Sequence, residues 1–462
     1  SPLTFSSGFV LTAMLFCENR SFGTSYSNLP FINCSILLFN VLTPLFLFFS
    51  RCLFYIEQFL FSGYNVNYTL QMQQTQPLEK LHQTSCMTRK KERSIYDMLK
   101  HKDHFHGSDL EKIERIYGIP KEQITSFSAN VNPLGISPLL RDTLSRHVDA
   151  ITSYPDRDYT KLRKSICDYT GAQFENIIVG NGSTELISLF IQSTHPKKAL
   201  ILGPTYSEYE REITLEGGHT LYYPLKEEND FQMNVDDFCH QLNDSIDLLV
   251  LCNPNNPTAS AITKKEMRKI LDTALQYGMF VMVDETYEEF APDAANMSSI
   301  PLTNNYTNLI VLRGISKFFA APGLRLGYAV TGNPDLLKHI NTKKNPWTIN
   351  SLAEIAGCIM FSDKEYIEKT KNLITTERER MTNELSKLDT VKVYPSCTNF
   401  ILVKILKEEV TSEMMFDHCI KKGLMIRDCS TFPFLDNSYI RFCLMSPEKN
   451  TELLEAMKEL LA

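Results

Sequence analysis

Residues 247–284 read DLLVLCNPNNPTASAITKKEMRKILDTALQYGMFVMVD. Two short apolar runs, at 247–252 and 280–283, flank a stretch with helical spacing of its apolar residues, 264–277, and Gly278 follows that stretch as a normal C-cap. An apolar strand, an amphipathic helix and a second apolar strand form the unit from which parallel sheets are built. This stretch therefore predicts an α/β fold with a mostly parallel sheet that is covered by helices on both faces.

The same alternation extends in both directions along the chain. Further strands are predicted at 176–179, 199–202 and 309–312, with helices that begin near Ser183 and Ser207. After Pro346 the pattern is helical up to about residue 388; strands are then predicted at 391–394, 400–403, 424–427 and 439–444, with helices near 412–422 and 447–461. We predict a large domain over about 150–345, and a smaller α+β domain formed by about 102–149 with 346–462.

The first 71 residues differ sharply in composition from the rest. They contain four charged residues, and the run FINCSILLFNVLTPLFLFFS at 31–50 is long enough to span a bilayer, although two asparagines and a proline interrupt it. Three interpretations remain open: a non-native or unstructured extension, which we favour, a membrane anchor, and a part of the folded core. Residues 72–101 are polar and are predicted to be a linker to a catalytic region at 102–462.

The composition excludes several classes of protein. The 462 residues include 47 Lys and Arg against 54 Asp and Glu, a net charge of −7 that argues against a general nucleic-acid binder. The 12 cysteines form no C-x-x-C pair, which excludes a zinc ribbon and favours a reducing, cytoplasmic setting, with membrane anchoring as the alternative. The spacing of His101, Asp103, His104 and His106 fits no common zinc pattern, so no metal is predicted.

Polar residues follow the predicted strands at their carboxyl ends, where ligands bind in such sheets. Gly182-Ser183 opens a helix, Asn256-Pro-Thr forms a rigid loop, Asp284 is followed three residues later by a tyrosine, and Lys317 lies eight residues before an arginine. Each motif alone is compatible with a simple turn. A lysine near a buried strand end is suited to imine formation, because desolvation favours the neutral amine. No P-loop and no G-x-G-x-x-G motif occurs, so ATP and nicotinamide chemistry lose support.

Taken together, the order and spacing of these motifs resemble those of the pyridoxal-phosphate (PLP) enzymes of the fold-type I aminotransferase superfamily, class I/II, over about residues 105–462. Within it the chain most resembles the L-threonine-O-3-phosphate decarboxylases, and the histidinol-phosphate aminotransferases are next. His106-Gly107 and KFFAAPG at 317–323 lean towards the decarboxylases. Asn-x-Asn-Pro at 130–133 and Tyr154-Pro-Asp are shared with the aminotransferases.

This resemblance implies a cofactor, pyridoxal 5′-phosphate, and its binding residues. Lys317 would hold PLP as an imine and later move protons at the substrate α-carbon, and Asp284 would keep the pyridine nitrogen protonated. Asn256 and Tyr287 would donate hydrogen bonds to the phenolic oxygen, and Tyr206 would stack on the ring. The residues that would cradle the phosphate are Gly182, Ser183, Ser316 and Arg325.

The resemblance also implies a homodimer and a substrate site. Tyr154 would reach the PLP phosphate of the other subunit. Arg441 would bind the substrate carboxylate as a bidentate fork. The substrate end, where a second anionic group could sit, would be lined by His106, Asn132 and Arg427.

Two reactions stay open. If the Cα–COO⁻ bond breaks, the enzyme is a decarboxylase of threonine phosphate or a similar amino acid, in cobalamin biosynthesis; if the Cα–H bond breaks, it is an aminotransferase acting on histidinol phosphate or another amino acid. We favour the decarboxylase. Of the four departures from the family pattern, Ser108, Ala259, Gly314 and Met445, the last bears on the choice of substrate, because that position is often basic in the decarboxylases. A PLP-binding transcription factor is disfavoured, because residues 1–100 show no basic recognition helix.

Overall fold

The computed structural model describes residues 107–461. The predictions for residues 1–71, for the linker at 72–101 and for His106 lie outside these described residues. None of the helices in 107–461 is long and apolar enough to cross a membrane.

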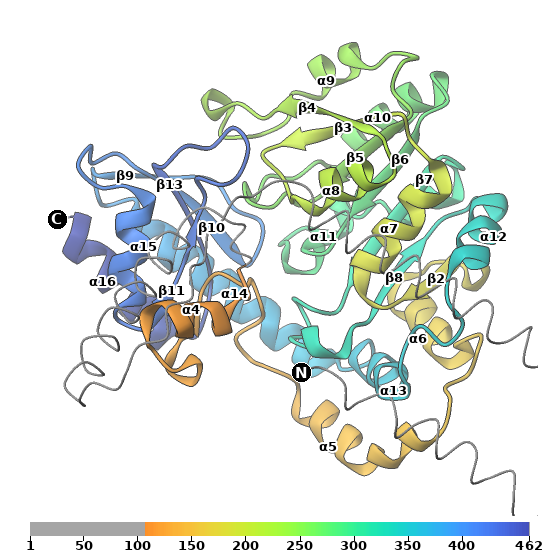
Figure 1. Ribbon diagram of the computed structural model, residues 1–462, viewed down its shortest axis with the longest axis horizontal. Helices are drawn as coiled ribbons and strands as arrows, with labels where there is room; N and C mark the ends of the chain where they lie inside the picture. The colour runs from red at the N-terminus through yellow and green to blue at the C-terminus, as the bar shows by residue number, and fades with distance from the viewer. Residues whose placement is uncertain (1–106, 462) are drawn as a thin grey trace, which may run out of the picture. The chain divides into compact units, whose positions relative to one another are not determined.

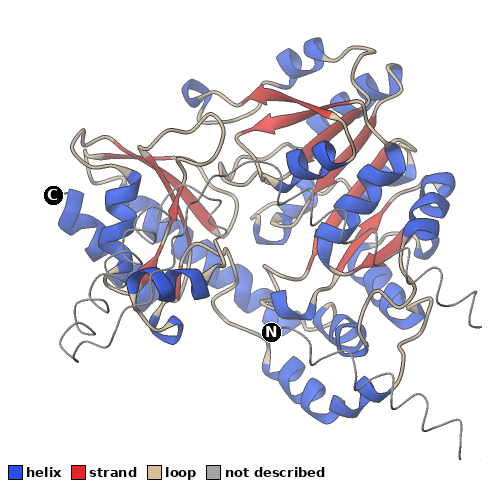
Figure 2. Ribbon diagram, in the orientation of Figure 1, coloured by secondary structure: helices blue, strands red, loops and turns tan. Residues whose placement is uncertain are grey.

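The larger of the two main sheets has seven strands and is mostly parallel (Figures 1 and 2). In their side-by-side order these strands are β2 (Ile177–Gly180), β8 (Gly327–Val330), β7 (Leu309–Gly314), β6 (Phe280–Asp284), β5 (Leu248–Cys252), β3 (Lys198–Gly203) and β4 (His219–Pro224). Only β8 runs antiparallel to its two neighbours, β2 and β7. The predicted fold class is thereby confirmed.

Helices cover both faces of this sheet, and successive strand residues enter the two cores in turn. In β5, Leu249 and Leu251 belong to one core, whereas Leu248, Val250 and Cys252 belong to the other. The first core includes α6 (Thr160–Thr170), α10 (Lys264–Gln276) and α13 (Ser351–Met360); the second includes α7 (Gly182–Thr194), α8 (Glu208–Leu215) and α12 (Pro334–Lys343). Two further helices, α9 (Val235–Gln241) and the short α11 (Ala294–Met297), lie in the loops after β4 and β6. Because the strands are buried on both faces, their sequences read as continuous apolar runs.

The smaller sheet has four antiparallel strands and its own helices (Figure 2). Its order is β12 (Arg427–Asp428), β13 (Tyr439–Cys443), β10 (Phe400–Ile405) and β9 (Val391–Val393). The helices of this part are α4 (Leu110–Tyr117), α14 (Lys364–Leu385), α15 (Ser412–Ile420) and α16 (Pro447–Leu461), and α5 (Pro138–Arg146) packs on α13. The predicted strand at 424–427 is two strands: β11 (Leu424–Met425) pairs with β1 (Thr125–Ser126), and β12 pairs with β13.

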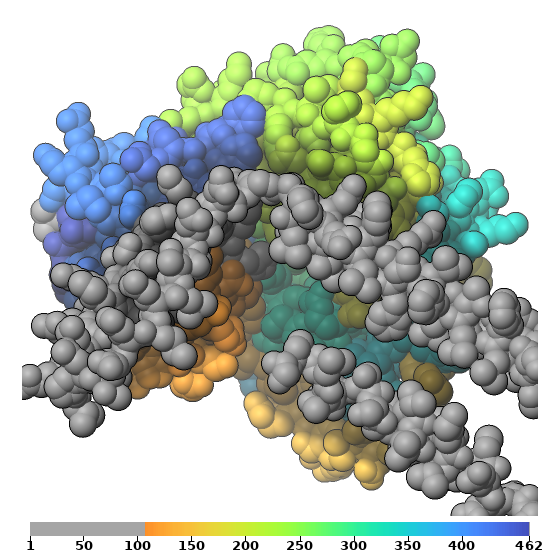
Figure 3. Space-filling model, in the orientation of Figure 1, coloured from red at the N-terminus to blue at the C-terminus, as the bar shows by residue number. Residues whose placement is uncertain are grey.

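Several contacts join the two sheets, and two of them involve β4 and the turn that follows it. Glu227, in the turn after β4, accepts hydrogen bonds at 2.8 Å from the Tyr394 and Tyr439 hydroxyls and pairs with Lys404 at 2.8 Å. In the loop between β12 and β13, the Phe434 ring lies 5.5 Å from the Tyr222 ring on β4. The space-filling view shows blue residues of the C-terminal part meeting green residues of the large sheet (Figure 3).

Candidate active site

The carboxyl ends of three central strands bring the predicted polar residues together. Asp284 is the last residue of β6 and is almost fully buried. Asn256 follows β5, next in the sheet, and Lys317 follows β7 on the other side. Neighbouring parallel strands end at one edge of a sheet, so residues that are 28 to 61 positions apart in sequence meet there.

Lys317 is held by the segment that precedes α5. Its ammonium donates to the backbone oxygen of Ala129 at 2.6 Å. Burial, together with the positive charges of Arg441 and Arg325, lowers its pKa from 10.5 to about 8. The neutral amine that imine formation requires is therefore accessible near neutral pH.

Asp284 accepts hydrogen bonds on both carboxylate oxygens. Thr286 donates to Oδ1 through its backbone N–H at 3.0 Å and its hydroxyl at 2.6 Å, and the Tyr209 hydroxyl donates to Oδ2 at 2.7 Å. Burial raises the pKa of Asp284, and these donors oppose that effect. Sequence reasoning gave Tyr209 no role at the site, and no local pattern marks it, because Asp284 lies 75 residues further along the chain.

Backbone geometry at the start of α7 leaves no space for side chains. Gly182 has φ +79°, and a Cβ at this position would collide with the Arg325 guanidinium. A Cβ on Gly327 would come within 2.5 Å of the Ser183 nitrogen and 2.6 Å of the Gly182 carbonyl carbon. The first N–H groups of a helix, beside a guanidinium and a serine hydroxyl, form a cradle that fits a phosphate group.

Gly314 supplies no hydroxyl to this cradle, where many relatives have a serine or threonine. A Cβ there would lie 3.4 Å from the Ser183 hydroxyl, so a hydroxyl-bearing side chain would point toward the same place. Ser316 lies two residues further on, half-buried.

Ala259 has φ +57°, in the region that favours glycine, so the alanine that replaces the family's usual glycine carries a strain of roughly 1 kcal/mol.

Arg441 lies across the site from the sheet edge. It is buried on β13, where one Nη donates to Ser128 O at 2.7 Å and the other contacts Asn256 Oδ1. Its Nε is buried and has no partner among the described residues. Arg427 lies directly opposite on β12 and donates to the Thr431 hydroxyl at 2.8 Å. Directly opposed residues share a face of the sheet, so both arginine side chains leave the same face.

The segment Ser128–Asn132 closes the site from the side of Arg441. Asn130 donates to the Tyr287 hydroxyl at 3.2 Å, and its own Oδ1 is buried without a partner among the described residues. Gly107 packs so tightly on Ser128 that a Cβ would come within 2.8 Å of its hydroxyl. Residue 107 therefore lies beside this segment. Asn130 is the member of the Asn-x-Asn motif that sequence reasoning passed over.

Asn132, which was predicted to contact substrate, is engaged within the protein. Its amide donates to Phe318 O at 2.7 Å and to the Thr370 hydroxyl at 2.8 Å, and its oxygen accepts from Leu134 N at 3.0 Å. These contacts fit a residue that holds the loop in place. Its substrate role stays a prediction.

Tyr154 does not reach the site of its own chain. It is 80% exposed, and its ring packs against Trp347 with centroids 4.8 Å apart.

Tyr206 lies at the site, edge-on to Tyr209 with centroids 5.5 Å apart. Met445 follows β13, where its backbone N–H donates to Asn450 at 2.8 Å.

A buried charge cluster adjoins the site. Arg313, on β7, pairs with Glu285 at 2.7 Å and Glu288 at 3.0 Å, and nearby Glu289 accepts from the Tyr169 hydroxyl at 3.0 Å. Burial raises the pKa of Glu288 to about 8, and the repulsion of the other two carboxylates adds to this against the attraction of Arg313.

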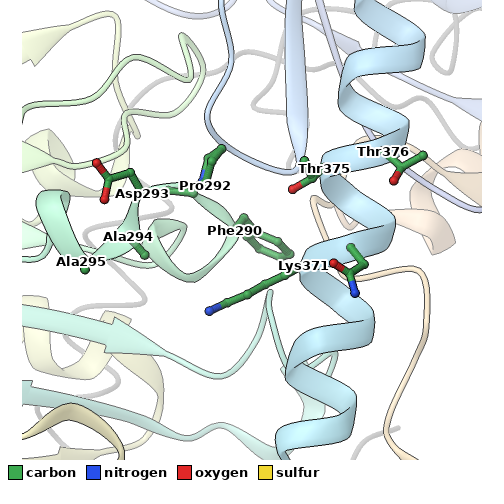
Figure 4. Close-up of a pocket in the computed structure, with 10 residues that line it drawn as sticks. Phe290, Pro292, Asp293, Ala294, Ala295, Lys371, Thr375 and Thr376 are labelled. Carbon is green, nitrogen blue, oxygen red and sulfur yellow. The ribbon is translucent and has the colours of Figure 1, made fainter.

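A separate cavity of about 460 Å³ lies between α14 and the segment after the turn η5 (Glu288–Phe290), as Figure 4 shows. One wall is Phe290–Ala295, and the other comprises four polar residues of α14, Lys371, Asn372, Thr375 and Thr376. None of the predicted site residues lines it. Within residues 107–461, no group of three or more His, Cys, Asp or Glu side chains is arranged to hold a metal ion.

Comparison with known families decides the assignment. The family model of aminotransferase class I and II matches residues 122–457, more than half of the chain. This chain belongs to the class I and II aminotransferase family. The predicted enzyme class, PLP-dependent decarboxylases and aminotransferases, and its cofactor are confirmed.

Individual relatives support the same family. A protein of Caldanaerobacter subterraneus subsp. tengcongensis, provisionally named a threonine-phosphate decarboxylase, is 39% identical over 332 residues, which cover 72% of this chain and 89% of that one. The threonine-phosphate decarboxylase of Salmonella typhimurium is 30% identical, covering 77% and 96%. The crystal structure of histidinol-phosphate aminotransferase from Clostridium acetobutylicum superposes with a TM-score of 0.68 at 33% identity, covering 72% and 98%.

The residues of this chain fit the family's cofactor. A lysine with a lowered pKa, a buried carboxylate at the end of β6 and a phosphate-sized cradle at α7 occur at one sheet edge. When bound, PLP supplies an electron sink that stabilises negative charge at the substrate α-carbon.

Proposed function

We propose that this protein is a decarboxylase of O-phospho-L-threonine or a closely similar phosphorylated amino acid, in cobalamin biosynthesis. The observation that carries the proposal is the pair Arg427 and Arg441, opposed on neighbouring strands, with no acidic side chain of residues 107–461 bonded to Arg441. Arg441 is a buried cation whose bonded partners among residues 107–461 are neutral, so a substrate carboxylate would supply its anionic partner. Arg427, which leaves the same face of the sheet, lies where a second anionic group, a phosphate, could sit. The 39% identical relative supports this choice.

The residues of the chain then have distinct tasks. Arg441 holds the substrate carboxylate through the Nε and Nη atoms that face it, and Arg427, steadied by Thr431, holds the second anionic group. Lys317 holds the cofactor, and afterwards gives a proton to the α-carbon from which carbon dioxide has left. Asn256, which contacts Arg441, links the cofactor end of the site to the carboxylate end.

Histidinol phosphate is the second candidate substrate, with amino transfer as the reaction. A phosphate group alone carries up to two negative charges, so it could also occupy the arginine pair. The 33% identical Clostridium structure supports this alternative.

The two candidates are separated by one experiment. The purified full chain is loaded with PLP and given O-phospho-L-threonine, while released carbon dioxide and the cofactor's visible absorption are followed, with Lys317→Ala as the control. Release of carbon dioxide with the absorption restored after each turnover supports the decarboxylase. Accumulation of the amine form of the cofactor, reversed by a keto acid, would establish an aminotransferase instead.

We further propose that the active unit is a homodimer in the cytoplasm. Exposed apolar side chains gather near Tyr154: Val148 is 52% exposed, Ile151 65% and Trp347 41%. Such a patch is typical of a protein interface, and a second copy would cover it. Ile151→Glu should shift the mass measured by light scattering from dimer to monomer, whereas an unchanged mass would contradict the proposal.

A further inference from the structure

Asp284 lies in an unusual set of contacts for a residue that must sustain a positive charge on the cofactor. Its carboxylate is 4% exposed and accepts three hydrogen bonds, two from Thr286 to Oδ1 and one from Tyr209 to Oδ2. No Lys, Arg or His of residues 107–461 forms a salt bridge with it. The three neutral donors are therefore its only observed stabilisation in the described chain.

Tyr209 connects two parts of the cofactor site. It is the second residue of α8 and is fully buried. Its hydroxyl bonds Asp284, and its ring meets the Tyr206 ring edge-on, at an interplanar angle of 85°. One side chain thus touches both the group predicted to face the ring nitrogen and the group predicted to cover the ring.

A buried carboxylate and a pyridine nitrogen share one proton, and the stronger base of the two holds it. Removal from water makes the carboxylate a stronger base, whereas each hydrogen bond donated to its ionised form makes it weaker. Donors on Asp284 therefore keep the proton on the ring nitrogen, where it strengthens the electron sink. Without them the proton moves toward Asp284.

The other titratable groups that face Asp284 do not supply charge. They are Tyr206 and Tyr209 on the α8 side, Cys252 on β5 and Tyr287, and burial raises the pKa of each, that of Cys252 to about 12. All four are neutral near pH 7, so the balance depends on hydrogen bonds rather than on ion pairs.

We propose that Tyr209 is a positioning residue that keeps Asp284 ionised and thereby keeps the cofactor's ring nitrogen protonated. This inference rests on the binding of PLP at this site, which is part of the proposed function, and it adds a residue to those expected to hold the cofactor. Thr286 assists on the other carboxylate oxygen.

The test is made on the holoenzyme without substrate. Each variant is loaded with PLP labelled with ¹⁵N in the ring, and the nitrogen resonance and the pH at which the visible band changes are recorded. Tyr209→Phe should move the resonance toward that of unprotonated pyridine. The pH of the band change should rise by about one unit, the tenfold change expected for one charge-assisted hydrogen bond. Thr286→Val should shift both in the same direction, which keeps the test open if Tyr209→Phe folds poorly.

Tyr222→Phe is the matched control, because Tyr222 also donates to a carboxylate, that of Glu210 at 2.8 Å, away from the site. It should change neither reading. If Tyr209→Phe and Thr286→Val bind PLP with unchanged resonance and pH dependence and lose only thermal stability, Tyr209 is a packing residue and the inference is wrong. If the wild-type chain binds no PLP, the proposed function itself fails.

Discussion

Two carboxylate clusters in this protein have opposite electrostatic balances. At Glu227, one carboxylate is served by one lysine and two tyrosine hydroxyls; partial burial raises its pKa, but these partners more than offset that, and the pKa falls to about 2. At Arg313, one guanidinium pairs with two buried carboxylates, Glu285 and Glu288, with Glu289 nearby, and burial raises the pKa of Glu288 to about 8. Burial raises the pKa of both carboxylates, and it prevails at the almost fully buried Glu288 but is outweighed by three donors at the partly exposed Glu227.

The location of each cluster gives this difference its meaning. The Glu227 cluster joins the two sheets, away from the candidate site, and its role is structural. The carboxylates of the Arg313 cluster lie in the segment 284–290, which also carries Asp284 and Tyr287. Strongly shifted pKa values gather at functional sites, and here the shift adjoins the site.

The largest expected effect comes from removing the shared cation. Arg313→Met should destabilise the fold by about 3–5 kcal/mol, because it leaves two buried carboxylates, Glu285 and Glu288, without the cation that they pair with. Denaturant titration at pH 7 measures the change. Arg146→Met, which breaks an exposed pair with Asp142, should cost at most about 1 kcal/mol. Equal losses in the two variants would contradict the contrast between these sites.

Glu288→Gln should stabilise the protein by roughly 2 kcal/mol at pH 9 and have little effect at pH 5. The folded pKa of about 8 lies above the usual value of 4.5, so the folded chain binds more protons than the unfolded chain between these pH values. Stability therefore falls as the pH rises through this window, and glutamine removes the fall. The measurement is the free energy of unfolding against pH. Glu365→Gln, an exposed partner of Lys369, should leave that profile unchanged.

Glu227→Gln should have the opposite sign, with a loss of about 1–2 kcal/mol at pH 7, a value reduced for solvent screening because a third of the side chain is exposed. The folded pKa of about 2 lies below the usual 4.5, so the stabilisation is complete above about pH 4.5 and fades as the pH falls toward 2. A loss that persists undiminished at pH 2.5 would mean that packing, not charge, is responsible.

The smallest change is expected for Tyr394→Phe, about 0.5–1 kcal/mol, since Glu227 keeps Lys404 and Tyr439. Its combination with Glu227→Gln in a double-mutant cycle isolates the energy of that hydrogen bond. A coupling energy near zero would show that the three partners do not act as a unit.

How far the sequence predicts this fold depends on burial. The unit β5–α10–β6 is predicted to within a residue or two, because apolar runs mark both strands and the helix begins at a capping box of Thr263 and Glu266. β4 is missed because it is an edge strand with exposed side chains, and β8 because it has four residues and directly follows the Arg325 loop. Neither leaves a continuous apolar signal.

The candidate site divides in a similar way. Lys317, Asp284 and Asn256 stand at strand ends, where local sequence marks them. Tyr209 and Asn130 could not be assigned from local pattern, because their partners lie 75 and 157 residues away. Only the folded chain places them.

The bond between Arg441 and Ser128 has a consequence for the timing of synthesis. These residues are 313 positions apart, and at about 5–20 residues per second roughly 15–60 s of synthesis separate them. The large sheet, complete by residue 330, can form while β13 is still untranslated. A nascent chain therefore carries Lys317 and the phosphate cradle before Arg427 and Arg441 have been synthesised. The substrate side of the site is completed only near the end of translation.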